Sequence, residues 1–349
     1  MLCRLPEKLG IAILIASCIC FSACGGVSTS TVNNGPTTVA YVWGSNYPTF
    51  DGGTAQTIQE FSTVSPNSTS PIATLTLPVS CDGGPLVTDS QGQLYVACFS
   101  PSSAPSILVF PPNPNGTVTP LRTIVLSGAY YEIRTLAIGP NDQLYVGALQ
   151  NSGVNDVLYA VLIYAQGVSG LAVPLHTIQM PSNNVLIDTA VDGTGNIYAA
   201  TDPLAPGAGS VSYVYIYSLN GTPTPMPSIG SSFFIYGVAV DNSGNIFITT
   251  RTGSGNGFPV IEEFTLASTG YESLVNTVNL TSLPDLPGSE LGSGPVRVDG
   301  AGNVFTALYS GSYSNFNYAL YGLSSTSDEN DSPIVQSTHN SYNNSFALH

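Results

Sequence analysis

Four aspartates stand before turns that contain glycine, and evenly spaced carboxylates are the first residues to test for metal or acid–base chemistry. They are Asp89, Asp192, Asp241 and Asp299. Metal ligands must converge on one point, and these acids occur one per repeat without the spacing of a calcium-binding loop. An aspartate in this place can cap the turn with its own side chain. We therefore expect turn-capping residues rather than metal ligands.

Histidine and serine give no stronger catalytic signal. The chain has three histidines, His176, His339 and His349, and they do not cluster. A zinc site needs several such ligands together, and no serine occupies a G-x-S-x-G elbow. Catalytic groups must also converge in one pocket. We expect no catalytic residue, no metal and no cofactor, with an enzyme as the less favoured hypothesis.

The aspartates belong to a repeated stretch that recurs five times at spacings of about 50 residues. Each copy reads as a strand, a turn that usually contains glycine, and a second strand whose consecutive apolar residues need cover on both faces. Two further strands joined by a Gly- or Pro-rich loop follow each copy. Such four-stranded units pack radially in a β-propeller. The copies are residues 85–97, 135–147, 188–200, 237–249 and 295–307.

The two ends of the chain complete the expected ring. Residues 38–43, "TVAYVW", read as a second strand without a first one, and 345–349, "SFALH", match the first strand of the other units. The C-terminus is therefore expected to supply the first strand of the first blade. This predicts an all-β, six-bladed β-propeller of four-stranded antiparallel blades, closed by the C-terminal strand.

The motif "GVAVDNSGNIFIT" (237–249) resembles the core of NHL repeats, which form six-bladed propellers. The loop "VFPPNPNGTVTPLRTI" is similar to loops of exported bacterial propeller proteins. The resemblance covers residues 38–349 and implies the fold. Some NHL-like propellers are lyases or lactonases, so it makes a metal-dependent lyase or hydrolase conceivable. Function depends on the site carried by the fold.

The N-terminus has the pattern of an export signal. Arg4 and Lys8 precede an apolar run over 9–23, which ends in "FSACGG". This resembles a bacterial lipoprotein signal with Cys24 as the lipidated residue, although Phe21 departs from the usual branched aliphatic. Cys18 and a plain cleaved signal are the alternatives. The expected divisions are a signal peptide over 1–23, a flexible tether over 24–37 and the propeller.

Charge restricts the partners. From Cys24 on, the chain keeps four arginines, no lysine and 20 acidic residues, a net charge of −16. Such a surface repels nucleic acid and anionic lipid. We expect an exported, monomeric envelope protein that is held at a membrane only by its N-terminal lipid, on the outer membrane if the cell has one.

Two cysteines remain beyond the signal region. Cys81 and Cys98 flank a predicted hairpin that folds about residues 90–92, so they face each other near its open end. An exported protein can form a disulfide. We expect Cys81 and Cys98 to be bonded; two buried thiols are the alternative.

One face of the predicted propeller gathers the candidate binding residues. The loops that lead into the first and third strand of each unit open on this face, around the channel mouth, and they are rich in aromatic residues. Arg297 stands where other units have Val or Ala, and a buried arginine needs a carboxylate such as Asp188, Glu132 or Asp82. Two alternatives need no ligand. Arg297 and its partner could form a structural ion pair that plugs the channel, and the aromatic rings could only cover the strand ends of their own blades. The candidates are Trp43, Tyr47, Asp82, Tyr131, Glu132, Arg134, Asp188, Tyr236 and Arg297.

Aromatic rings beside carboxylates suit a sugar face or a protein partner. The sequence thus favours a non-catalytic module that binds a glycan or a protein, ahead of a metal-dependent lyase or hydrolase at the channel mouth. A structural envelope scaffold is the third possibility.

Overall fold

The computed structural model describes most of the chain after residue 38. The described residues are 39–43, 56–63, 70–79, 81–99, 104–128, 130–151, 157–182, 184–204, 211–218, 224–225, 234–251, 259–266, 272–280, 291–312, 315–323, 335–339 and 345–349. They are almost entirely β-strand, with one short 3₁₀ helix, η1 (Pro140–Asp142). Among them, no helix has the length and apolar character needed to cross a membrane.

The repeated stretches form tight antiparallel hairpins. In β14 (Asn184–Val191) and β15 (Ile197–Pro203), Val191 pairs with Ile197 across the turn. Gly195 in that turn has a φ of +87°, which glycine adopts at little cost because it lacks a Cβ. All but the last residue of β15 are buried, since neighbouring sheets cover both of its faces.

Four sheets consist of four antiparallel strands each, taken from one continuous stretch of chain. Sheet 3 has β9 (Tyr130–Ile138), β10 (Leu144–Asn151), β11 (Val157–Tyr164) and β13 (His176–Gln179). Sheet 4 has β14, β15, β16 (Tyr213–Tyr217) and β17 (Thr224–Pro225). Sheet 5 has β18 (Gly237–Val240), β19 (Asn245–Arg251), β20 (Pro259–Leu266) and β21 (Glu272–Asn279). Sheet 6 has β22 (Leu291–Val298), β23 (Val304–Ser312), β24 (Asn315–Leu323) and β25 (Val335–His339).

Two sheets differ from the expected four antiparallel strands, because each gains a fifth, parallel strand at its outer edge. Sheet 2 contains β4 (Asp82–Thr88), β5 (Leu94–Phe99), β6 (Ser106–Phe110) and β8 (Arg122–Leu126), and β12 (Gly170–Ala172) pairs with β8. Likewise β7 (Gly116–Thr117) pairs with β3 (Ala73–Thr76) of sheet 1. Both added strands come from the glycine-containing loop between the last two strands of the following sheet. They cover edges that would otherwise expose unpaired backbone groups.

Sheet 1 combines both ends of the described chain. It contains β1 (Val39–Trp43), β2 (Thr57–Ser62), β3 (Ala73–Thr76) and β7, and β26 (Phe346–Leu348) lies beside β1. Tyr41 pairs with Ala347, and the backbones of Val39 and His349 exchange two hydrogen bonds of 3.0 Å. The C-terminal segment thus takes the first place in this sheet.

The hydrophobic core is divided among the spaces between adjacent sheets. Buried side chains form a cluster between each sheet and the next, for example Val87 of sheet 2 with Leu136 of sheet 3. A further cluster joins sheets 6 and 1, where Phe305 packs with Phe61 and Phe346. Burial of these apolar surfaces is the main force that holds neighbouring sheets together.

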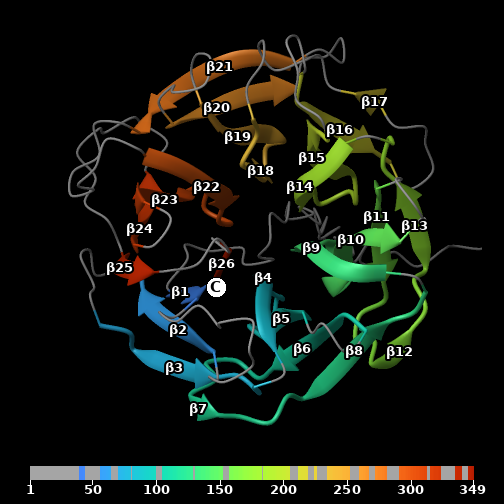
Figure 1. Cartoon of the computed structure of the whole chain (residues 1–349). Coiled ribbons are helices and arrows are strands. Elements are labelled where there is room, and N and C mark those ends of the chain that lie inside the picture. The colour runs from blue at the N-terminus through green and yellow to red at the C-terminus, as the bar shows by residue number, and fades with distance from the viewer. Residues whose placement is uncertain are drawn as a thin grey trace, which may run out of the picture.

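The sheets are arranged radially about a centre, which makes the molecule a β-propeller (Figure 1). One strand of each sheet lies nearest the centre. Each of these strands contacts the next, in the order β4, β9, β14, β18, β22 and β26, and β26 contacts β4. The fold is therefore an all-β propeller of small antiparallel sheets with almost no helix.

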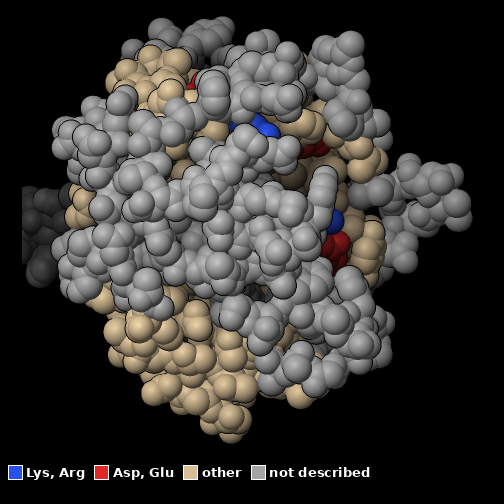
Figure 2. Space-filling model, turned by 60° about the vertical axis from the view of Figure 1, so that its left-hand side comes forward, with Lys and Arg blue, Asp and Glu red and all other residues tan. Residues whose placement is uncertain are grey.

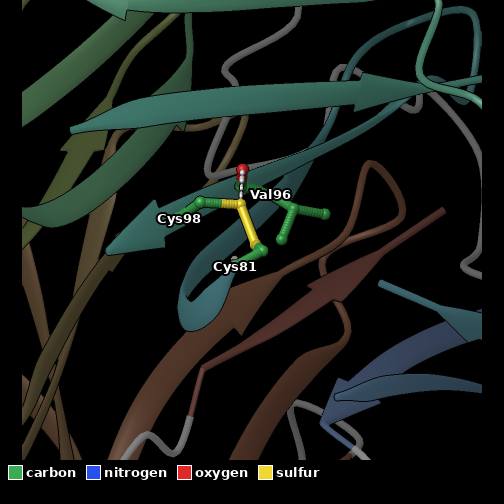
Figure 3. The surroundings of a disulfide bond; sticks show 3 residues. All are labelled: Cys81, Val96 and Cys98. Atoms are coloured by element: carbon green, nitrogen blue, oxygen red, sulfur yellow. Dashed lines mark hydrogen bonds between the residues drawn. A yellow bond between two sulfur atoms is a disulfide. The ribbon is translucent and has the colours of Figure 1, made fainter. Parts of the chain in front are cut away.

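A disulfide joins Cys81 to Cys98 at the open end of the β4–β5 hairpin (Figure 3). The Cα atoms are 4.7 Å apart. The pairing is diagonal rather than directly opposite, because a register shift between Gly83 and Leu86 places Gly83 opposite Cys98. Both cysteines are buried, and the Cys98 Sγ lies 3.8 Å from the Val96 carbonyl oxygen.

Candidate functional site

The repeated aspartates cap their turns. Asp192 Oδ1 accepts hydrogen bonds of 2.9 Å from the backbone N–H groups of Thr194 and Asn196. Asp241 and Asp299 accept the same pair of hydrogen bonds in their own turns, and Asp89 does so in the turn between β4 and β5. Among the described residues, no three His, Cys, Asp or Glu side chains gather as metal ligands would. The capping interpretation accounts for all four residues.

At the centre of the propeller, Asp188 of β14 and Arg297 of β22 form a buried ion pair. The Nη1 of Arg297 lies 2.7 Å from Oδ2 of Asp188, and Nη2 lies 3.3 Å from Oδ1. Their side chains are only 5% and 6% exposed, for Arg297 and Asp188 respectively. Of the three carboxylates considered from the sequence as partners of Arg297, the structure places Asp188 against it. Glu132 pairs with Arg134 instead.

The Asp188 carboxylate is occupied on both oxygens. Oδ2 also accepts a hydrogen bond from the N–H of Val238 in β18, and Oδ1 accepts one from Thr189 N–H. The Arg297 guanidinium also lies 5.9 Å from the ring centre of Phe346 in β26. The pair therefore ties together inner strands of sheets 4, 5 and 6 and touches sheet 1. This arrangement suits a structural pair better than a proton-transfer group.

The loop face is the face on which β9, β14, β16, β18 and β22 begin and on which β15 and β19 end. On it, sheet 3 presents Tyr131, Glu132 and Arg134, here called the Tyr131 cluster. Arg134 Nε lies 2.9 Å from Glu132 Oε1, and the Tyr131 side chain is 44% exposed. The Tyr159 hydroxyl of β11 forms a hydrogen bond with the Arg134 side chain. Burial raises the pKa of the Tyr159 hydroxyl, and the nearby Arg134 lowers it in part. The cluster offers an exposed ring beside paired charges.

A second group on the loop face lies between sheets 4 and 5. Asp202 near the end of β15 accepts hydrogen bonds from the Ile235 N–H, at 3.2 Å, and from the Ser212 hydroxyl. Burial raises the pKa of the Asp202 carboxyl, and these two hydrogen bonds lower it in part. We call Asp202, Phe234, Tyr236 and Arg251 the Phe234 cluster.

In the Phe234 cluster, the arginine lies against one of the two rings. The Arg251 guanidinium at the end of β19 is 5.8 Å from the Tyr236 ring centre, a cation–π distance. Burial raises the pKa of Tyr236, while the nearby arginine lowers it and Asp202 raises it. Phe234 is 47% exposed, which is high for a phenylalanine in a folded protein.

The structure places the predicted candidates in three situations. Asp188 and Arg297 meet at the centre, whereas Tyr131, Glu132, Arg134 and Tyr236 lie on the loop face. Trp43 ends β1 and Asp82 begins β4, so their backbones also reach this face. Tyr47 and Cys24 lie outside the described residues. His176 is exposed on β13.

Sequence reasoning missed Asp202, Arg251 and Tyr159. Asp202 lies next to the end of the second strand of its unit and Arg251 ends the second strand of the next unit, at a position where the units of sheets 2 and 3 have uncharged residues. A comparison of the repeats at the end of that strand, and not only at its start, would have singled out both charges.

Charged residues make up a small part of the chain. On the face drawn in Figure 2, the described Lys, Arg, Asp and Glu residues show only in a few small patches. The whole chain has six basic and 21 acidic residues in 349.

Comparison with known proteins gives the fold alone. No family model matches the sequence. No curated protein matches it either. A protein of unknown function from Bacteroides caccae has a similar structure, with a TM-score of 0.56 and 11% identity over 89% of this chain and 99% of that one. A GH43_1 enzyme from Xanthomonas citri gives 0.36 and 8% over 89% and 94%. A virginiamycin B lyase from Staphylococcus aureus gives 0.34 and 7% over 75% and 85%.

Proposed function

We propose that this protein is an exported, lipid-anchored, NHL-like β-propeller of six blades that binds a glycan or a protein through its loop face without catalysing a reaction. The six-blade count rests on sheet 1, in which β26 joins β1, β2 and β3 as the inner strand. The closed order of inner-strand contacts supports closure by the C-terminal strand. The NHL assignment rests on the repeated hairpin motif, and the anchor on the signal that ends at Cys24.

The observation that carries the non-catalytic proposal is the Asp188–Arg297 pair. In a propeller enzyme with a site at the channel, reactive groups near the axis must be free to meet substrate. Here the central carboxylate already receives the guanidinium and two backbone N–H groups. A recognition role for the aromatic residues of the loop face agrees better with this arrangement.

Array binding with the full chain tests this proposal. We expect the protein to bind at least one glycan or one envelope protein, and the Trp43→Ala, Tyr131→Ala double variant to lose that binding. Leu171→Ala on the outer edge is the matched control, because Leu171 is 73% exposed on β12 and away from the loop face. Absence of any ligand, together with turnover of a substrate that depends on added metal, would favour the lyase or hydrolase instead.

A further inference from the structure

Two clusters on the loop face share one composition although they come from different sheets. Each has an exposed ring, Tyr131 in one and Phe234 in the other. Each also has an arginine and a carboxylate: Arg134 is paired with Glu132, whereas Arg251 and the buried Asp202 both lie near Tyr236. The sequence repeat does not explain this likeness, because the charged residues stand at different positions of the repeat. A shared ligand would explain it.

We propose that the Tyr131 and Phe234 clusters together bind one neutral oligosaccharide. This proposal rests on the proposed binding function of the loop face and specifies its ligand. A sugar ring has an apolar C–H surface that packs on an aromatic ring. Its hydroxyl groups donate to a carboxylate and accept from a guanidinium. Both clusters contain all three kinds of group.

Charge selects a neutral sugar over an acidic one. The chain from Cys24 onward carries a net charge of −16 with four arginines. Arg134 is already paired with Glu132, and Arg297 with Asp188. No lysine follows residue 8 to balance a carboxylate or a sulfate on the ligand. An anionic glycan would therefore meet net repulsion at this face.

The separation of the clusters selects an oligosaccharide over a single sugar. The Tyr131 cluster belongs to sheet 3, and the Phe234 cluster lies between sheets 4 and 5. The inner strands β9, β14 and β18 contact one another in that order. Because packed sheets lie about 10 Å apart, the two rings are separated by on the order of 20 Å. Tyr213 and Tyr215 of β16, with ring centres 5.6 Å apart, lie in sheet 4 between the two clusters.

Calorimetric titration of the full chain tests the proposal. The probes are neutral cello-, xylo- and manno-hexaose, the matching monosaccharides, and the acidic hexamer of galacturonic acid. We expect at least one neutral hexaose to bind, its monosaccharide to bind at least tenfold more weakly, and the acidic hexamer not to bind. Tyr131→Ala and Phe234→Ala should each weaken hexaose binding about tenfold, whereas Leu171→Ala should leave it unchanged.

The outcomes separate this proposal from the one on which it rests. Binding of galacturonate, or of proteins on the array, without any neutral hexaose overturns the oligosaccharide proposal and leaves the binding function standing. Hexaose binding that survives both ring substitutions also overturns it. No binding of any sugar or protein overturns both. Circular dichroism of each variant shows whether a loss of binding comes from a loss of fold.

Discussion

Oδ2 of Asp188 lies 2.7 Å from Nη1 of Arg297, although the two residues are 109 positions apart in the chain. The same oxygen accepts the N–H of Val238 from the strand that lies between them in the ring. One carboxylate thus joins three successive inner strands. A buried pair of this kind stabilises a fold only while both partners remain, because each charge depends on the other for compensation.

Removal of the carboxylate should therefore destabilise the propeller strongly. In Asp188→Ala the buried guanidinium loses its counter-charge and the Val238 N–H loses its acceptor. We expect the free energy of unfolding to fall by about 3–5 kcal/mol. Asp188→Asn should lose less, because the amide oxygen can still accept a hydrogen bond. Urea denaturation monitored by circular dichroism measures both variants.

The exposed pair on the loop face provides the control. The side chains of Arg134 and Glu132 are 41% and 31% exposed, so water screens their attraction. Arg134→Ala should lower the free energy of unfolding by at most about 1 kcal/mol. Equal losses in Asp188→Ala and Arg134→Ala would show that the central pair is not a special feature of the fold.

The Cys81–Cys98 disulfide should contribute to stability by restricting the unfolded chain. The bonded residues are separated by 17 positions. Closure of a loop of this size is worth about 3 kcal/mol in the chain-entropy description. We expect the Cys81→Ala, Cys98→Ala double variant to lose about that much in urea denaturation. Alkylation of both thiols in the wild-type protein, unfolded without reductant, would contradict the bond.

The ionisation of Glu60 should make the free energy of unfolding depend on pH. Its side chain is buried in β2, and burial raises the pKa of the carboxyl above its ordinary value of 4.5, while the Tyr41 hydroxyl lowers it in part. The folded state therefore holds this proton more tightly than the unfolded state. The resulting stability is present below pH 4.5 and is lost as the pH rises through the folded pKa.

A glutamine at this position cannot ionise. The free energy of unfolding of Glu60→Gln should therefore rise relative to that of wild type between pH 4 and pH 7. Urea denaturation at several pH values gives the difference. Parallel pH profiles for the two proteins would show that Glu60 ionises equally easily in both states.

Membrane attachment should depend on one cysteine. If Cys24 carries the lipid, Cys24→Ser moves the protein from the membrane fraction to the soluble fraction of a bacterial host, and removes incorporation of labelled fatty acid. Cys18→Ser should leave both unchanged, because that residue lies within the cleaved signal. The reverse pattern would assign the lipid to Cys18, and soluble wild-type protein would indicate a plain cleaved signal.

Much of the fold could be predicted from the repeat, because the residues that determine each hairpin turn lie within that hairpin. Asp192 and Gly195 fix a turn that depends on neighbouring residues alone, so the pattern in the sequence is sufficient. The parallel strands β7 and β12 were not predicted. Each pairs with the edge of a different sheet, and two or three residues in a glycine-containing loop carry no strand pattern of their own.

The site was predictable only in part, for a similar reason. Arg297 stood out because it breaks the repeat, but the choice of Asp188 over Glu132 depends on where the strands lie in the ring. Arg251 and Tyr236 meet within sheet 5, but Asp202 belongs to sheet 4 and comes near Tyr236 only after the two sheets pack together. Such a cluster depends on tertiary packing, which the sequence of either unit does not show.

Hydrogen–deuterium exchange of the full chain with and without its array-identified ligand tests the central claim most directly. If the loop face is the binding surface, the ligand should slow exchange in residues 130–134 and 234–237. Exchange in the turns around Asp89 and Asp192, on the opposite face, should not change. Protection confined to those turns, or exchange unchanged throughout at saturating ligand, would contradict a binding site on the loop face.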